Sequence, residues 1–159
     1  MIISHTPMRI SFLGGGTDYP DYFRNHGGTT LATSINMYST ISVLPLFPYF
    51  GYKLKAVYSQ IETVNDLDEF QHPSIRACLR FLNITEGIEI HYSGDLPGRT
   101  GLGTSSSFTV GLLHALHAYK GELISNRQLA EEAILIEQEM IGERVGNQDQ
   151  LIAALGGFR

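Results

Sequence analysis

The stretch that most constrains the fold is a glycine- and hydroxyl-rich loop at residues 94–107, between two segments of regular pattern. A strand-like run at 88–92 precedes the loop, and a helical pattern with apolar Phe108, Leu112 and Leu116 on one face follows it. Glycines before a helix start let an anion approach free backbone amides at the positive end of the helix dipole. The loop is therefore predicted to hold phosphate. It lacks the Gly-Lys-Ser/Thr ending of a Walker A loop, and an ordinary glycine turn with a hydroxyl N-cap is the alternative.

Composition restricts the class of protein and its partners. The 159 residues are 43% apolar, which suits one globular domain with a real core. A formal net charge of −5 argues against a nucleic-acid partner, which requires a basic face. The single Cys78 excludes an intrachain disulfide and is consistent with a reducing compartment. No secretory signal pattern and no apolar run of about 20 residues appears, so we expect a cytoplasmic protein without a membrane partner.

The N-terminal segment carries a second glycine-rich loop. Extended residues 2–12 lead into Gly14, Gly15 and Gly16, followed by Thr17 and Asp18. Apolar residues on both sides favour a backbone packed against something over a disordered one. A short carboxylate on such a loop suits hydrogen bonding to hydroxyl groups, and the alternative for Asp18 is a cap on a helix at 19–24.

A carboxylate in an apolar setting marks the C-terminal part of the chain. A capping box at Ser125 opens a helix that is predicted to reach about Ile141. On the wheel of that helix Met140 lies on the apolar face and Gln138 faces solvent, whereas Glu137 falls inside the apolar arc. A carboxylate there requires a cation or several hydrogen-bond donors, and an ion pair with Arg144 is the simpler alternative.

A further carboxylate, Asp149, begins a short apolar helix that Gly156 and Gly157 close. Asp149 either caps this helix or projects from its rigid start into a cleft, as a general base must. The chain between 62 and 71 is acidic and is predicted to be a solvated surface loop.

Taken together, three stretches resemble the superfamily of small-molecule kinases that includes galactokinase, homoserine kinase, mevalonate kinase and phosphomevalonate kinase. Residues 7–19 resemble its N-terminal substrate motif, and residues 97–106 resemble its ATP-phosphate loop. Glu137, residues 146–150 and the final glycine pair resemble the region of the magnesium ligand and catalytic aspartate. The triple glycine and the Gly-Asn-Gln-Asp-Gln run most resemble the branch that phosphorylates heptose 7-phosphate, with fucokinase-like sugar-1-kinases as neighbours.

The resemblance implies an ATP-dependent phosphotransferase that adds phosphate to the anomeric hydroxyl of a sugar, such as D-glycero-D-manno-heptose 7-phosphate or the substrate of a fucokinase-like enzyme. ATP and Mg²⁺ are the implied cofactors, and the sugar phosphate and ATP are the implied small-molecule partners. The implied fold is the α+β two-layer sandwich of ribosomal protein S5 domain 2.

The resemblance also implies residue roles. Asp149 would orient or deprotonate the sugar hydroxyl, and Arg9 beside it would offset charge on the transferring phosphoryl group. Ser105 and Glu137 would bind Mg²⁺. The implied nucleotide contacts are Pro97, Gly98, Gly101, Leu102, Gly103, Thr104, Ser105 and Ser106, and the implied substrate contacts are Gly15, Gly16, Thr17 and Asp18. Thr104 replaces the family's usual serine but keeps a hydroxyl group. Gly15 and Gly16 replace Glu and His of galactokinases, which argues against a galactose-type contact set.

Kinases of this superfamily close their site with a C-terminal α+β domain that carries a third glycine-rich motif, for which residues 1–159 have no counterpart. We therefore expect this sequence to be an N-terminal ATP-binding domain, and a homodimer is compatible with it. Two other interpretations stay open. One is a module that binds ligand without turnover. The other is sister chemistry on the same scaffold, either decarboxylation of a phosphorylated acid or phosphorylation of a non-sugar alcohol.

Overall fold

The structure is a computed structural model that describes residues 1–98 and 100–159, so Arg99 of the predicted phosphate loop lies outside the described residues. The strands pair in one sheet in the order β1-β2-β5-β3-β4, and only β3 and β5 run parallel. The strands are β1 (Ile2–Leu13), β2 (Leu31–Pro45), β3 (Leu54–Val57), β4 (Ile61–Val64) and β5 (Ile88–Gly94). The helices are α1 (Pro20–His26), α2 (Pro73–Phe81), α3 (Thr104–Lys120), α4 (Asn126–Leu135), the π-helical η3 (Ile136–Ile141) and α5 (Gln148–Leu155), with short 3-10 turns η1 (Pro48–Phe50) and η2 (Leu67–Glu69).

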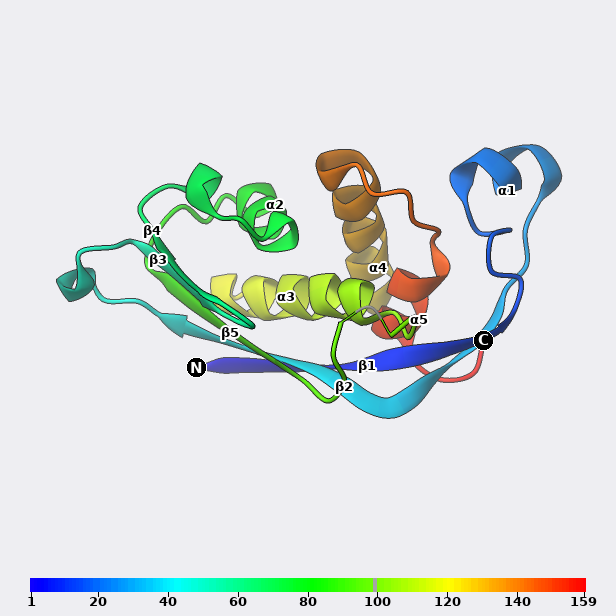
Figure 1. The fold of residues 1–159 in the computed structure, drawn as a ribbon, viewed down its shortest axis with the longest axis horizontal. Helices are drawn as coiled ribbons and strands as arrows, with labels where there is room; N and C mark the ends of the chain where they lie inside the picture. Colours follow the sequence, from blue (N-terminus) through cyan, green and yellow to red (C-terminus); the bar gives the residue numbers. More distant parts are fainter. Residues whose placement is uncertain (99) are drawn as a thin grey trace.

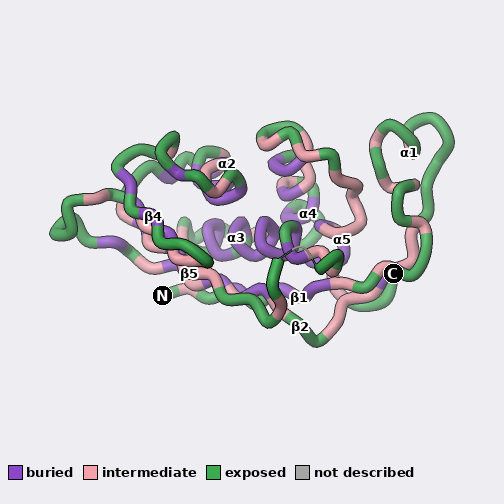
Figure 2. The backbone as a smooth tube through the Cα atoms, viewed as in Figure 1, coloured by how far each residue is buried: buried purple, intermediate pink, exposed green. Residues whose placement is uncertain are grey.

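Helices α2 to α5 cover one face of the sheet, with α3 lying along it (Figure 1). Because side chains alternate across a strand, Met8, Ile41 and Val43 enter the core while Ile3 of β1 stays exposed on the other face. Helix α3 is buried along most of its length, at the centre of the molecule (Figure 2). The predicted α+β fold with two layers is therefore confirmed.

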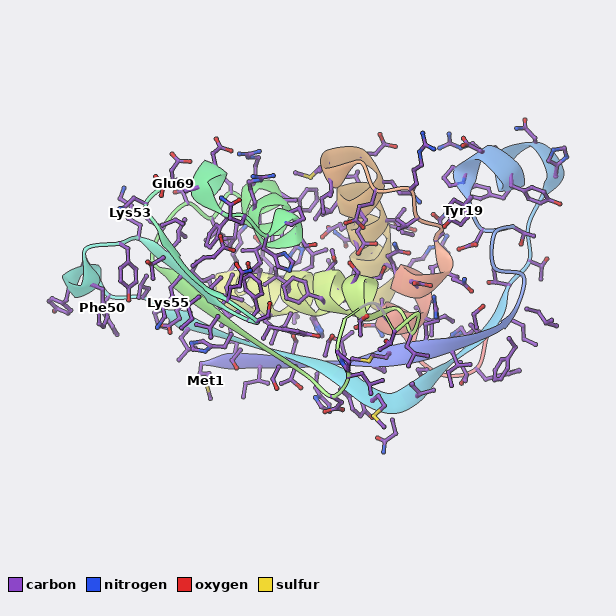
Figure 3. All side chains as sticks on the ribbon, viewed as in Figure 1. Met1, Tyr19, Phe50, Lys53, Lys55 and Glu69 are labelled. Atoms are coloured by element: carbon purple, nitrogen blue, oxygen red, sulfur yellow. The ribbon has the colours of Figure 1, made fainter. Side chains whose placement is uncertain are left out.

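The two ends of the elongated molecule carry different loops. Phe50, at the tip of the β2–β3 connection, and Tyr19, beside α1, lie at opposite ends (Figure 3). The glycine loop at 94–103 joins β5 to α3 between these ends (Figure 1). Across residues 1–98 and 100–159, no helix combines the length and apolar character needed to cross a membrane.

The prediction of a solvated loop at 62–71 is wrong in part. Residues 65–69 lie largely exposed outside the sheet, but residues 61–64 form β4, and Glu62 is only 8% exposed. Its carboxylate accepts hydrogen bonds from the Tyr58 hydroxyl at 2.7 Å and from the backbone N–H of Gln71 at 2.6 Å. Burial, followed by this bond to Glu62, raises the pKa of Tyr58 to about 12. One carboxylate of an acidic run can thus enter a sheet when donors outside its own strand satisfy it.

The predicted helix from 126 to 141 is present, but it changes geometry at Leu135, where α4 gives way to the π-helix η3. The π-helical turn is wider than an α-helical turn and changes the directions in which the following side chains point. The predicted orientations of Gln138 and Met140 are therefore wrong. Gln138 does not face solvent but donates to Val145 O at 2.9 Å and Asn147 Oδ1 at 2.8 Å, and Met140 is 39% exposed. Glu137 remains buried as predicted. Such π turns occur often at functional sites.

Candidate active site

The glycine loop is held against β1 through Arg9. The Arg9 backbone N–H donates to Leu102 O at 3.1 Å, and its Nη1 donates to Gly101 O at 2.7 Å. Gly103 is the N-cap of α3 with φ +72°, and a Cβ there would lie 3.2 Å from Arg9 Cγ and 3.4 Å from Asp149 Oδ2. Both the left-handed backbone and this close approach require glycine. Within the described part of the chain, no side chain caps α3, so its first amides can receive an anion.

Asp149 and Arg9 form a two-point ion pair between the first turn of α5 and β1. Arg9 Nε donates to Asp149 Oδ1 at 2.7 Å, and Arg9 Nη2 donates to Oδ2 at 2.8 Å. Parallel bonds of this kind fix the carboxylate in direction as well as in place. The predicted proximity of the two side chains is present, and Asp149 does not cap α5. One guanidinium group therefore contacts both Asp149 and the glycine loop.

Glu137 is 1% exposed, and its two oxygens differ sharply. Oε2 accepts from Ser106 Oγ at 2.9 Å and, through a short contact, from Gln150 Nε2. Oε1 has no hydrogen-bond partner among the described residues. Burial raises the pKa of Glu137, although the neighbouring Thr109, Gln150 and Ser106 side chains oppose the shift. The alternative of an ion pair with Arg144 is not formed in the described structure.

The hydroxyl group that contacts Glu137 directly belongs to Ser106. Ser105, which the resemblance implies as a Mg²⁺ ligand together with Glu137, is exposed beside a cavity. The reason is helical phase, because α3 begins at Thr104 and successive residues diverge by about 100°. Both hydroxyl groups lie in the first turn of α3, next to the amides that face the loop.

The residues around Glu137 fit a magnesium ion bound together with phosphate. In residues 1–98 and 100–159, no group of three or more His, Cys, Asp or Glu side chains is arranged to hold a metal. Mg²⁺ does not require such a cage, since it commonly takes one or two carboxylates, waters and substrate phosphates. The buried, unpartnered Oε1 of Glu137 is an acceptor that a cation would satisfy.

The N-terminal glycine loop lies beside the start of α5. Asp18 Oδ1 accepts from Gly16 N at 3.0 Å, and Oδ2 accepts from Gln148 N at 3.2 Å. Asp18 thus caps α5 across 130 residues of sequence, and the alternative of a cap on the helix at 19–24 is wrong, because Tyr19 is the N-cap of α1. Thr17 Oγ1 donates to Gly14 O at 2.8 Å and closes the loop. Gly15 and Gly16 are exposed next to it.

A cavity of about 520 Å³ adjoins the start of α3. Gly98, Thr104 and Ser105 line its loop side, and its aromatic side consists of Tyr58, His72, Tyr92 and Phe108. The His72 ring stacks on Phe108 with centroids 4.8 Å apart, and burial lowers the pKa of His72, which favours the neutral ring. This aromatic wall was not predicted from the sequence. Tyr92 and Phe108, shortly before and after the glycine loop, were its local signal, whereas Tyr58 and His72 come from other parts of the chain. Pro97 is exposed at the same loop.

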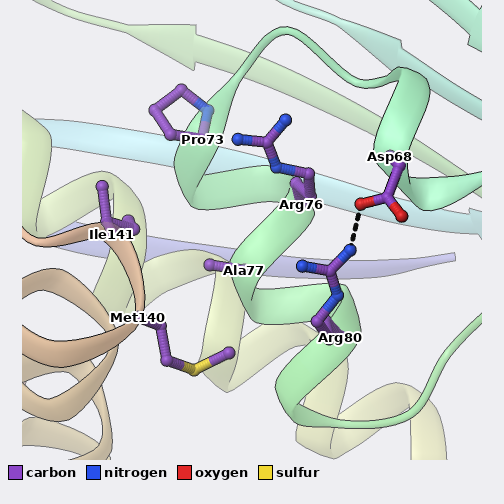
Figure 4. Close-up of a pocket in the computed structure, with 7 residues that line it drawn as sticks. All are labelled: Asp68, Pro73, Arg76, Ala77, Arg80, Met140 and Ile141. Carbon is purple, nitrogen blue, oxygen red and sulfur yellow. Dashed lines mark hydrogen bonds and ion pairs between the residues drawn. The ribbon is translucent and has the colours of Figure 1, made fainter.

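A second cavity, of about 320 Å³, lies between α2 and η3 (Figure 4). Its charged side chains already have partners, since Arg80 pairs with Asp68 and Arg76 Nη1 donates to Phe70 O at 3.1 Å. Met140 and Ile141 form its apolar wall. The first cavity, and not this one, adjoins the glycine loop.

Comparison with known proteins shows which family and which proteins this chain is similar to. Residues 71–157 match the family model described as the GHMP kinases N terminal domain. The D-glycero-alpha-D-manno-heptose 7-phosphate kinase of Campylobacter jejuni is 30% identical, over 99% of this chain and 49% of that protein. The galactokinase of Mannheimia succiniciproducens is 28% identical, over 96% of this chain and 41% of that protein.

A solved structure has the same fold as this chain. The D-glycero-D-manno-heptose 1-phosphate kinase of Bacteroides thetaiotaomicron matches with a TM-score of 0.88 and 24% identity, over 99% of this chain and 55% of that chain. The predicted sandwich of the ribosomal protein S5 domain 2 type is thereby confirmed. This chain spans about half the length of each of these relatives.

Proposed function

Because this chain belongs to the GHMP kinases through their N-terminal domain, we propose that it is the ATP-binding domain of a sugar kinase. The proposed reaction transfers the γ-phosphoryl group of ATP to the anomeric hydroxyl of a heptose phosphate. The observation that carries the proposal is the Arg9–Asp149 pair, because the same guanidinium group contacts the glycine loop. That geometry sets a candidate base beside a candidate phosphate site.

Asp149 is proposed to orient the sugar hydroxyl and to accept its proton. The hydroxyl oxygen then bonds to the γ-phosphorus, and the bond from that phosphorus to the bridging oxygen of ADP breaks. Arg9 holds Asp149 in one orientation and lies where its positive charge offsets charge on the transferring group. Phosphoryl transfer depends mainly on positioning and electrostatics, so few covalent steps are required of the protein.

The first turn of α3 is proposed to bind the nucleotide phosphates through its free amides. The cavity beside this turn is proposed to take the nucleotide base, because Tyr58, His72, Tyr92 and Phe108 in its lining offer aromatic rings for stacking. Glu137, with the hydroxyl of Ser105 or Ser106, would hold Mg²⁺. When bound, that ion would neutralise phosphate charge during transfer.

Substrate contacts are proposed at the N-terminal glycine loop. Asp18 is held by two backbone N–H groups and lies beside the helix that carries Asp149, so its position relative to the base is fixed. Gly15 and Gly16 present backbone without side chains, which leaves room for a sugar. The Campylobacter relative supports a heptose phosphate, since its name specifies heptose 7-phosphate, while the Bacteroides protein is named for heptose 1-phosphate.

The test is ADP release with ATP, Mg²⁺ and D-glycero-D-manno-heptose 7-phosphate, with fucose and galactose as competing substrates. Asp149→Ala should abolish turnover and keep nucleotide binding, because it removes the base and leaves the loop amides. Nucleotide binding without turnover on any sugar would favour the second candidate, a binding module. Absence of both binding and turnover would contradict both.

A further inference from the structure

Gln150 is a fully buried polar residue that the proposed reaction does not yet use. It is 0% exposed in a helix whose following residues, 151–155, are all apolar. Its Nε2 donates to Glu137 Oε2, while its own Oε1 has no partner among the described residues. Buried side-chain amides are normally hydrogen-bonded, so an amide with one end used and one end free requires an explanation.

The arrangement constrains how the Glu137 carboxylate can turn. Two donors, Ser106 Oγ from α3 and Gln150 Nε2 from α5, both reach Oε2. Rotation of the carboxylate would break both bonds at once, so Oε1 is held in a single direction. Oε1 is also the oxygen without a donor, which leaves it as the acceptor available to a cation. By holding Oε2, Gln150 thus determines the direction in which the unpartnered Oε1 points.

We propose that Gln150 is a positioning residue for the Mg²⁺-binding carboxylate, an inference that rests on the function proposed above. It is not among the substrate and phosphate contacts proposed above. It holds Glu137 through Oε2 and directs Oε1 toward the ion. Because Asp149 precedes it in the same turn of α5, Gln150 also ties the metal carboxylate to the proposed base. Residues that orient metal ligands in this way typically affect metal affinity by about 10- to 100-fold.

The test is titration calorimetry of ADP binding to the 159-residue protein at increasing Mg²⁺, supported by electron paramagnetic resonance of bound Mn²⁺. Gln150→Met keeps the length of the side chain and removes its donor. We expect cation-dependent ADP affinity to weaken about 10- to 100-fold, while ADP affinity without cation changes less than about twofold. The matched control is Gln128→Met, which removes another Gln-to-Glu hydrogen bond (Nε2 to Glu132 Oε1, 3.0 Å) on the exposed face of α4 and should leave both affinities unchanged.

Two outcomes separate this inference from the proposed function. If the wild-type protein binds Mg²⁺–ADP and Gln150→Met keeps the same cation dependence, Gln150 has no positioning role, although the proposed function stands. If the wild-type protein shows no cation-dependent binding at all, both are overturned. Should Gln150→Met fail to fold, Gln150→Asn keeps an amide but is one methylene too short to reach Glu137. The same loss is expected of it, and wild-type cation affinity in that variant would overturn the inference.

Discussion

Replacing Glu137 by glutamine should make the metal-free protein more stable. The carboxylate is buried with one oxygen unpartnered, and burial raises its pKa, so the folded state disfavours the charged form. Glutamine keeps an oxygen acceptor for Ser106 and Gln150. It replaces the unpartnered oxygen with a neutral amide group, so the folded state no longer buries a charge there.

The size of the gain follows from those contacts. An unsatisfied buried polar group costs about 1–3 kcal/mol, and the substitution relieves such a cost at Oε1. For a domain of this size, 1 kcal/mol shifts the melting temperature by about 2–4 °C. The Glu137→Gln variant should therefore melt roughly 3–10 °C above wild type at neutral pH without Mg²⁺.

The gain should depend on pH with a defined sign. A carboxyl group whose pKa is raised on folding binds protons more tightly in the folded state, so wild-type stability falls as pH rises from the unfolded to the folded pKa. The variant lacks this group. The difference between variant and wild type should be small at acid pH, grow as pH rises through the folded pKa, and then level off.

Thermal and urea unfolding at several pH values measure this difference. The matched control is Glu139→Gln, an exposed glutamate of the same η3 segment, which should change stability by less than about 0.5 kcal/mol. With Mg²⁺ and ADP present the order should reverse, since only wild type gains from the cation. A Glu137→Gln variant that melts below wild type at pH 8, or a gain that is the same at all pH values, would refute the reasoning.

Three further predictions concern other parts of the site and the core. Arg9→Lys keeps the charge but loses the two-point pair with Asp149, so the rate of ADP release should fall at least about tenfold while nucleotide affinity changes less. Gly146→Ala should lower stability by about 1–3 kcal/mol because its Cβ would overlap the Asp18 carboxylate, whereas Gly98→Ala, with open space around its Cβ, should melt like wild type. Burial raises the pKa of the Cys78 thiol, so mass spectrometry should find iodoacetamide labelling only after unfolding, and labelling of the native protein at the rate of a free thiol would contradict this.

Features that the local sequence specifies were predictable. The glycine loop, the start of α3 and the Ser125 cap, whose Oγ accepts from Gln128 N at 3.2 Å, depend on residues close together in the chain. The burial of Glu137 was visible because one carboxylate interrupts an apolar arc. The pairing of Arg9 with Asp149, across 140 residues, came only from the resemblance to a kinase family, since no local pattern specifies it.

What the sequence did not reveal depends on tertiary donors and on helix phase. Glu62 was predicted to be a solvated charge, whereas the Tyr58 hydroxyl and the Gln71 backbone N–H both donate to it. The change from α to π geometry at Leu135 leaves no single-residue signal, and it reverses the expected side of Gln138. The choice of Ser106 over Ser105 depends on where α3 begins, and helix ends are uncertain by a residue or two in any sequence-based assignment.

The first turn of α5 connects more of the site than the glycine loop does. Three consecutive residues, about 100° apart on the helix, meet three different elements. The Gln148 backbone N–H is capped by Asp18, Asp149 pairs with Arg9 on β1, and Gln150 holds Glu137 of η3. An eight-residue helix is not stable alone, so these contacts and the packing behind them fix its position. A displacement of α5 must therefore move the proposed base, the metal carboxylate and the substrate loop together. Substitutions in the glycine loop away from Arg9 should instead affect nucleotide binding alone.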